Sequence, residues 1–553
     1  MKHSIHSPRS GRLAVAAAAA LGVMLSAAPP ASSAAPPASS TIPAASIPPI
    51  VDRETMPRTI ITTDGELDDM NSFTRFLYYT NEIDVAGIVY SSSVHHWKGD
   101  GVHTLSEARD AGIVTSFRGE TAGTPEHSSD AMTWRWNPDP WIEEKIAQYG
   151  EILGNLRQHD PNYPSAEDLL SKVAVGNVAF ENDFSADTPG SDLIKEVLLD
   201  DDERDVWLQA WGGQNTIARA LKSIEEEYAD SPDWESVRSR VIDKAVIATI
   251  GNQDNAYADY IGQAWPEIRV YNWGFTFTAW GGAKENAAIP SEIKSYYKYP
   301  FFTNHIKFDH GPLLEDFHLI GDGQYLNGES DAPGWQPGLA GVVYDLETWR
   351  MWDFLGPFEQ YDMVSEGDTP AFLPLINNGL RFLDDPTLGS WGGRFASNTS
   401  NPTQFRPQGD LNPVTDDREP RYSLYRWVPD AQDDFAARAD WGVSSFSNAN
   451  HAPVITLSDE NLTATPGATV KVHSQVRDPD RDNVTREWSF YEEASTVTSD
   501  ISIRLAGRGT AQNAFITVPA DAQPGERIVL NLTATDDGVH TLSEYGQVVI
   551  EVK

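Results

Sequence analysis

Four acidic residues lie within six positions of the chain, in the sequence TTDGELDD. They are Asp64, Glu66, Asp68 and Asp69, and they directly follow the β-branched run at residues 58–63 (RTIITT). Carboxylates packed this closely raise one another's pKa unless a cation or protons neutralise them. Their oxygens suit a hard divalent cation, Ca²⁺ or Mg²⁺. The alternative is an acidic helix start, stabilised by the helix dipole.

The composition of the chain limits this chemistry further. Its 553 residues include no cysteine, which excludes disulfides, thiolate metal sites and cysteine nucleophiles. A formal net charge of −40 argues against binding of a nucleic-acid polymer through its phosphates. Any metal in this protein is therefore held by oxygen, with or without help from histidine.

The elements that would position the acids follow an alternating pattern. Strand-like runs are separated by helix-like segments, at residues 58–63, 84–90, 205–211, 244–250 and 268–273. This alternation predicts an α/β fold with a parallel sheet and helices on both faces. Ligands bind at the carboxyl ends of strands in such sheets, where the acidic cluster falls. Residues 134–170, rich in Trp, Pro and Tyr, are expected to form an insertion over the sheet.

The amino-terminal region has the pattern of an exported protein. Lys2, Arg9 and Arg12 precede a short apolar run, which predicts a signal peptide at residues 1–28. Residues 29–56 form a Pro/Ala/Ser-rich linker. No later segment has the apolar length of a membrane span. We therefore expect a secreted, extracellular protein; an uncleaved anchor is the alternative.

The carboxyl-terminal region changes to short alternating strands, which predicts an Ig-like β-sandwich at 449–553 after an α/β domain at 57–448. Asp478, Asp480 and Asp482 in this region indicate either a cation site or an ordinary turn. They do not match an EF-hand loop, because Asn483 stands at its sixth position and Ser489 at its twelfth.

Two segments of the α/β region resemble motifs of nucleoside hydrolases. ITTDGELDD resembles their amino-terminal signature D-T-D-x-G-x-D-D, and residues 209–221 (QAWGGQNTIARAL) resemble their mid-chain loop and helix. Segments at 93–98, 253–254, 366–373 and 391–394 resemble a secreted bacterial cellulose-binding family. That family combines a nucleoside-hydrolase-like domain, an open and mostly parallel sheet with helices on both faces, with a C-terminal β-sandwich. The resemblance covers nearly the whole mature chain.

The resemblance implies a site in which Ca²⁺ activates a water that attacks the anomeric carbon of a ribosyl group. Asp64 would be both metal ligand and general base, and Asp69 and Asp368 would be further ligands. The backbone carbonyl of Ala210 would complete the metal site. Asp68 would accept hydrogen bonds from sugar hydroxyls.

Other residues are expected to contact the substrate. Trp97 and Trp211 follow predicted strands, and flat indole faces suit the C–H faces of sugar rings. The polar side chains expected to bind sugar are Asn215, Gln253, Asp254 and Glu366.

The chain also departs from the nucleoside hydrolase pattern. Thr62 replaces the first motif Asp, Glu66 replaces its Gly, and Gly367 replaces a late His. The acid that protonates the leaving group is consequently unassigned. Its candidates are His95, His96, His310, Glu66 and Glu366.

Two functions remain. The first is a secreted Ca²⁺-dependent hydrolase that cleaves an N-glycosyl (ribosyl) bond or a related glycosidic bond, such as a furanoside. The second is a non-catalytic carbohydrate-binding protein that recognises cellulose or another polysaccharide. The retained aspartates favour the hydrolase, whereas Thr62 and Gly367 favour the binding protein.

Overall fold

The computed structural model describes residues 51–115, 131–137, 140–281, 287–320, 322, 324 and 359–553. The predicted signal peptide and most of the predicted linker lie outside the described residues. None of the helices within the described ranges has the length and apolar character needed to cross a membrane.

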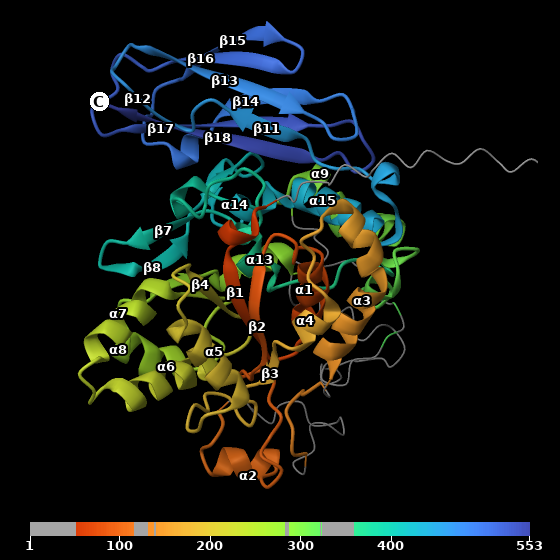
Figure 1. The fold of residues 1–553 in the computed structure, drawn as a ribbon, viewed down its shortest axis with the longest axis vertical. Helices are drawn as coiled ribbons and strands as arrows, with labels where there is room; N and C mark the ends of the chain where they lie inside the picture. The colour runs from red at the N-terminus through yellow and green to blue at the C-terminus, as the bar shows by residue number, and fades with distance from the viewer. Residues whose placement is uncertain are drawn as a thin grey trace, which may run out of the picture. The chain divides into compact units, whose positions relative to one another are not determined.

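The first part of the chain builds an eight-stranded sheet (Figure 1). All neighbours pair in parallel except β8 and β7 at one edge, which are antiparallel. In spatial order the strands are β3 (Val173–Val175), β2 (Asp84–Tyr90), β1 (Arg58–Thr63), β4 (Val206–Ala210), β5 (Ala245–Thr249), β6 (Arg269–Asn272), β8 (Asn401–Pro407) and β7 (Phe395–Asn398). The predicted α/β class with an open, mostly parallel sheet is confirmed.

Helices cover both faces of this sheet, because its central strands are apolar on both sides. Ile60 and Ile61, neighbours in β1, belong to different hydrophobic cores. One core receives α1 (Leu67–Leu77), α3 (Trp141–His159) and α15 (Val428–Val443); the other receives α5 (Pro189–Leu199), α6 (Asn215–Tyr228) and α7 (Trp234–Lys244). Shorter helices are α2 (Leu105–Asp110), α4 (Ala166–Leu170), α8 (Gly262–Ala264), α9 (Ser291–Lys294), α10 (Tyr299–Phe302), α11 (Pro312–Glu315), α13 (Thr369–Phe372) and α14 (Tyr422–Tyr425).

Residues 134–170, which the sequence predicts as an insertion over the sheet, contribute to the core of the α/β region. Most of the segment is helix α3, and its Ile142 and Ile146 are fully buried in the larger core. Its apolar residues recur at helical spacing, so one face of α3 belongs to the core.

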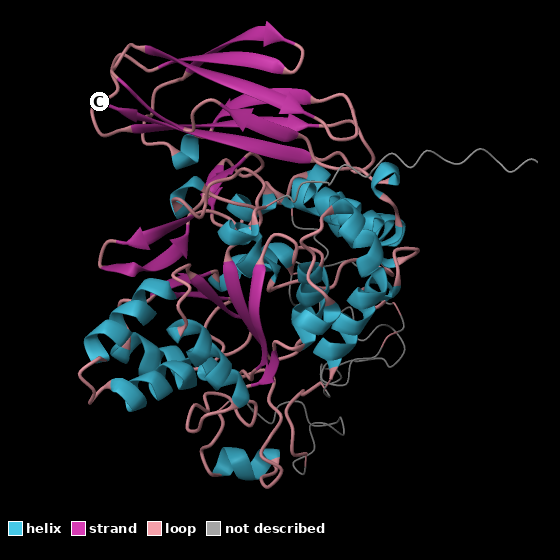
Figure 2. Cartoon of the chain, viewed as in Figure 1, coloured by secondary structure: helices cyan, strands magenta, loops and turns pink. Residues whose placement is uncertain are grey.

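The carboxyl-terminal strands form two four-stranded sheets (Figure 2). One has the order β11 (Val454–Leu457), β13 (Thr469–Arg477), β16 (Ala511–Thr517), β15 (Ser502–Arg508); the other has β12 (Asn461–Ala464), β18 (Ser543–Val552), β17 (Arg527–Thr535), β14 (Thr485–Phe490). Val472 and Ile516 of the first share a core with Leu530 and Val548 of the second, as in a sandwich. A small hairpin joins β9 (Asp410–Asn412) and β10 (Asp417–Glu419).

Candidate functional site

The acidic cluster lies at the turn between β1 and α1. Gly65 makes this turn with a φ of +77°, a conformation that residues with a side chain rarely adopt. A Cβ at this position would also lie 3.1 Å from Nε1 of Trp141 in α3. Asp64 therefore comes at the end of the strand, while Asp68 and Asp69 occupy the first turn of the helix.

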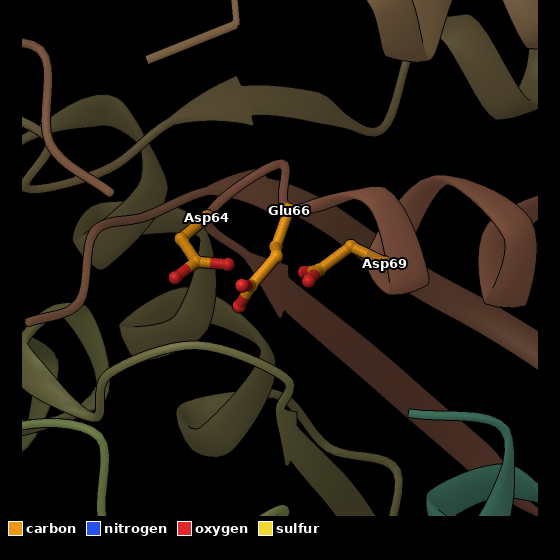
Figure 3. A group of neighbouring side chains, drawn as sticks. All are labelled: Asp64, Glu66 and Asp69. Carbon is orange, nitrogen blue, oxygen red and sulfur yellow. The ribbon is translucent and has the colours of Figure 1, made fainter. Parts of the chain in front are cut away.

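The structure brings the acids together in two overlapping groups. Asp64, Glu66 and Asp69 have carboxylate oxygens within 4.8 Å of one another, and so do Asp68, Asp69 and Asp368. Figure 3 shows the first group, with its carboxylates gathered beside the strand-to-helix turn. Asp368 comes from the N-cap of α13, about 300 positions further along the chain. Sequence-adjacent and distant acids thus form one cluster.

Burial makes this cluster electrostatically costly. Asp64, Asp69 and Asp368 are each about 1% exposed. Burial raises the pKa of Asp69 well above its usual range, and the charges of Asp368, Asp64 and Asp68 raise it further; a hydrogen bond from Thr63 Oγ1 at 2.5 Å only partly opposes this. The pKa of Asp368 is raised in the same way, first by burial and then by Asp68 and Asp64.

Three buried carboxylate oxygens in the cluster have no hydrogen-bond partner among the described residues. They are both oxygens of Asp64 and Oδ2 of Asp368. Burial raises the pKa of Asp64, and the charge of His96 lowers it only in part; the Ser93 hydroxyl adds a weaker lowering effect without reaching hydrogen-bond geometry. Uncompensated buried charges are normally paired or coordinate metals. An all-oxygen donor set with unused lone pairs fits Ca²⁺.

Two basic side chains of the site, His96 and Arg135, lie beside Glu66. His96 Nε2 lies 3.8 Å and Arg135 Nη2 lies 3.5 Å from Glu66 Oε1. Burial raises the pKa of Glu66, but the nearby His96 and the charge of Arg135 outweigh burial, so the pKa falls below its usual value. Asn137 Nδ2 donates to Gly65 O at 2.5 Å. Arg135 and Asn137 were not predicted; their segment stood out only through its aromatic residues.

The structure explains why glycine replaces the late histidine. A Cβ at Gly367 would lie 2.2 Å from Oδ2 of Asp68 and 3.2 Å from the Phe277 ring. A side chain at this position would have to displace Asp68, which also accepts a 3.5 Å hydrogen bond from Ser365 Oγ. The position therefore favours glycine while Asp68 stays in place.

Gly212 is the residue of the β4–α6 loop that lies against Asp64. A Cβ at this position would lie 2.7 Å from Asp64 Cγ, so the backbone here approaches the carboxylate closely. Ala210, two residues earlier, ends β4, and its carbonyl accepts a 3.1 Å hydrogen bond from Ile250 N. Metal binding by Ala210 stays a prediction, and this carbonyl has one oxygen lone pair in use.

The predicted sugar-binding residues of the α6 region are engaged within the protein. Asn215 Nδ2 donates to Ser92 Oγ and to the carbonyls of Asn177 and Asp183, and its Oδ1 accepts from Ser91 Oγ. Asp254 accepts from the backbone amides of Asn215 and Ala256. Both residues therefore hold the loops around the α6 N-terminus, and sugar binding by them would require breaking these bonds.

Gln253 keeps one unused polar atom. Its Nε2 donates to Trp211 O at 2.5 Å, while its buried Oε1 has no hydrogen-bond partner among the described residues. Gln253 thus remains a candidate for substrate contact, and its main chain accepts from Val94 N in the loop after β2.

The two tryptophans do not present the faces expected of them. Trp97 is fully buried and packs on Phe180 with ring centroids 5.2 Å apart. Trp211 is also fully buried, and its Nε1 donates to Gln209 Oε1 at 3.0 Å. Neither indole offers its flat face to solvent, because both fill hydrophobic clusters.

Two candidates for the leaving-group acid are occupied by other partners. Glu366 is fully buried and forms a two-bond ion pair with Arg75 of α1, at 2.7 and 2.8 Å. His310 lies 3.2 Å from Asp440 of α15. His96 and Glu66 remain beside the carboxylate cluster, and His95 is exposed in the same loop.

Two family models match this chain. Residues 58–395 match the family model described as cellulose-binding Sde182, nucleoside hydrolase-like domain. The chain belongs to this family. Residues 469–552 match the model described as cellulose-binding protein Sde0182, C-terminal domain. A search of curated proteins found no match.

A solved structure has a similar fold. A nucleoside hydrolase-related hypothetical protein from Saccharophagus degradans, described as associated with carbohydrate metabolism, is 24% identical with a TM-score of 0.62. The match covers 90% of this chain and 100% of that protein. The BIgI domain of beta protein from S. agalactiae matches over 18% of this chain and 98% of that domain, with 19% identity and a TM-score of 0.14.

Proposed function

We propose that this protein of the cellulose-binding, nucleoside-hydrolase-like family is a secreted Ca²⁺-dependent hydrolase that cleaves an N-glycosyl or related glycosidic bond. The observation that supports this proposal is the buried carboxylate cluster with three unpartnered oxygens. Asp64, Asp69 and Asp368 would hold the cation, and a bound Ca²⁺ would lower the pKa of an attached water.

The remaining roles belong to the protein's own side chains. Asp64 accepts the proton of the attacking water, since its oxygens have no other partner among the described residues. Asp68, at the edge of the cluster, accepts hydrogen bonds from sugar hydroxyls. His96, whose Nε2 lies 3.8 Å from Glu66 Oε1, donates a proton to the leaving group.

The test compares Asp64→Asn with Asp201→Asn, an exposed aspartate of the same domain. Wild type and Asp201→Asn should release free base from nucleosides or reducing sugar from furanosides in the presence of Ca²⁺. Asp64→Asn should lose at least about 100-fold in rate, the usual scale for a general base. Full activity of Asp64→Asn would rule out its assignment as the base.

A non-catalytic polysaccharide-binding protein is the second candidate. It is favoured by the occupied side chains of Glu366 and His310 and by Gly367 in place of a histidine. Sedimentation of the folded protein with insoluble cellulose, measured beside the release assays, separates the two functions. Binding to cellulose without any turnover in added Ca²⁺ would support the second function and contradict the first.

A further inference from the structure

The two sheets of the carboxyl-terminal sandwich differ in what covers their outer faces. Val529 of β17 and Tyr545 of β18 pack in the larger core of the α/β region, on the side of their sheet that faces away from the sandwich core. The β11–β13–β16–β15 sheet has no comparable cover among the described residues. Along β13, the inward Val472 and Val476 are buried, whereas the outward side chains are mostly exposed. This sheet therefore presents its outer face to solvent.

Basic side chains stand on this face, and acidic ones do not. Its basic residues are Lys471 and Arg477 of β13 and Arg504 of β15, and all three are exposed. No aspartate or glutamate occupies an outward position of the four strands as the structure describes them. In the whole sequence, acidic residues outnumber Lys and Arg by 81 to 41, so this face departs from the rest of the protein. Nor does any carboxylate of the described chain form an ion pair with these three cations.

The cross-strand register places two of these cations in one row. Lys471 of β13 and Arg504 of β15 are both Cα partners of Phe515 in β16. The Arg504 guanidinium lies over the Phe515 ring, 4.2 Å from its centroid, and this cation–π contact holds the guanidinium against the sheet. No described residue accepts a hydrogen bond from this guanidinium. Its N–H groups are therefore available for a carboxylate, which arginine binds through two parallel hydrogen bonds.

The spacing of the cations favours a long ligand over a single small anion. Neighbouring strands of a sheet are about 4.8 Å apart, so Lys471 and Arg504 are anchored about 10 Å from each other. Arg477 follows Lys471 by six residues on the same strand, which corresponds to about 20 Å. One carboxylate cannot contact all three cations. A polymer that carries carboxylates at intervals can.

The remaining polar side chains of the face suit a sugar polymer. Thr469 and Thr517 stand opposite each other on β13 and β16, with their hydroxyl oxygens 3.0 Å apart. On the same two strands, His473 Nδ1 donates to Asn513 Oδ1 at 3.1 Å. Hydroxyl and amide groups can both donate and accept hydrogen bonds, as sugar hydroxyls require.

A protein or a nucleic acid fits this face less well. At outward positions of the four described strands, Val454 and Phe515 are the only large apolar side chains, whereas the core of a protein interface is rich in them. Double-stranded DNA carries one negative charge per about 1.7 Å of its axis. Three cations spread over about 20 Å match a much lower charge density. The observations therefore favour a polysaccharide with spaced carboxylates.

We propose that the outer face of the β11–β13–β16–β15 sheet binds an anionic polysaccharide, whose sugar carboxylates pair with Lys471, Arg477 and Arg504. Phe515 is a positioning residue, because its ring holds the Arg504 guanidinium in place. Binding at this face requires neither the carboxylate cluster nor a metal ion. The proposal is therefore independent of the hydrolase function proposed above.

The test measures binding of the full-length protein to polygalacturonate, a soluble polymer of uronic acids, by calorimetric titration in the presence of a chelator. The chelator removes Ca²⁺, which would otherwise bridge the polymer to acidic side chains. The test variant is Lys471→Gln/Arg504→Gln. The control Arg481→Gln/Lys553→Gln removes the same number of charges from exposed positions of the same domain outside the four strands.

Wild type and control should bind polygalacturonate with equal affinity, and this affinity should fall as salt is added, because salt screens exposed charges. Lys471→Gln/Arg504→Gln should bind about tenfold more weakly and with a smaller salt dependence. Phe515→Leu keeps both cations but removes the ring, so it should weaken binding by a smaller factor. Melting temperatures of all variants verify that they are folded.

Three results would overturn the proposal. They are failure of the wild type to bind polygalacturonate, equal affinity of wild type and Lys471→Gln/Arg504→Gln, and tighter binding to double-stranded DNA than to polygalacturonate. None of them bears on the release assays with Asp64→Asn, so the two proposals fail separately.

Discussion

At the β1–α1 turn, backbone geometry limits which residue types can be present as strongly as charge does. Gly65 has a φ of +77° and faces the Trp141 indole, so Gly65→Ala meets both backbone strain and a steric contact. We expect Gly65→Ala to lower the free energy of unfolding by about 1–3 kcal/mol and to weaken Ca²⁺ binding at the carboxylate cluster. Gly101→Ala is the matched control, because Gly101 has a φ of +70° and a Cβ added there would have no atom within 4 Å. Equal losses of thermal stability in both variants would show that the Trp141 contact is unimportant.

The buried carboxyl group of Asp254 should make the free energy of unfolding depend on pH. Burial raises its pKa from 3.8 to about 7, against the hydrogen bonds from Ala256 and Asn215. A carboxyl group with a raised folded-state pKa gives stability that is present at low pH and is lost as the pH rises from about 4 through 7. Asp254→Asn should remove this decline, which amounts to up to about 4 kcal/mol. Urea unfolding of wild type and variant at pH 5 and pH 8 measures this change in the free energy of unfolding. An equal change in both proteins would contradict the raised pKa of Asp254.

At the scale of elements, an ion pair connects the two halves of the carboxylate cluster. Arg75 lies on α1, the helix that carries Asp68 and Asp69, and Glu366 lies two residues before Asp368. Both side chains are fully buried, and Arg75 also stacks on Phe435 of α15. Glu366→Gln leaves Arg75 without its counter-charge, and such losses cost about 3–5 kcal/mol.

The same substitution should lower Ca²⁺ affinity, because the two elements that carry the ligands are no longer held together. A double-mutant cycle with Arg75→Met measures the coupling energy by chemical denaturation. We expect Arg75→Met/Glu366→Gln to lose less stability than the sum of its single variants. Additive losses would mean that the pair does not link α1 to the segment before α13.

The elements also show what a sequence can and cannot predict. The runs at residues 58–63 and 84–90 became β1 and β2, because strands buried on both faces are continuously apolar or β-branched. The edge strand β7 and its neighbour β8 were missed, since their residues are largely polar and are mostly half-buried or exposed. The acids at residues 64–69 could be grouped from sequence because they are neighbours, whereas the burial of Trp97 and the pairing of Glu366 depend on contacts between distant segments.

At the scale of the whole molecule, the two predicted domains share a hydrophobic core. Tyr491, Val529 and Tyr545 of the carboxyl-terminal region belong to the larger core of the α/β region. Tyr545 N donates to Asn378 O at 2.9 Å, and its hydroxyl donates to Asp430 of α15. The backbones approach so closely that a Cβ at Gly379 would collide with Tyr545 O. The predicted boundary at 448/449 therefore separates sequence patterns more clearly than it separates packing.

A chain that ends at residue 448 should consequently be unstable. Removing residues 449–553 exposes the side chains that pack on Tyr545, including Trp427 at a ring-centroid distance of 5.2 Å, and leaves the Asn378 carbonyl without its partner. We compare residues 51–448 with residues 51–553, so that both chains lack the same amino-terminal segment. The shorter chain should bind a hydrophobic dye, melt at a lower temperature and bind Ca²⁺ more weakly at the carboxylate cluster. Tyr545→Phe, which removes only the hydroxyl bonded to Asp430, should have a smaller effect in the same direction. A shorter chain with the same melting temperature and Ca²⁺ affinity as the longer one would show that the α/β region does not need the sandwich for its core, despite the shared packing.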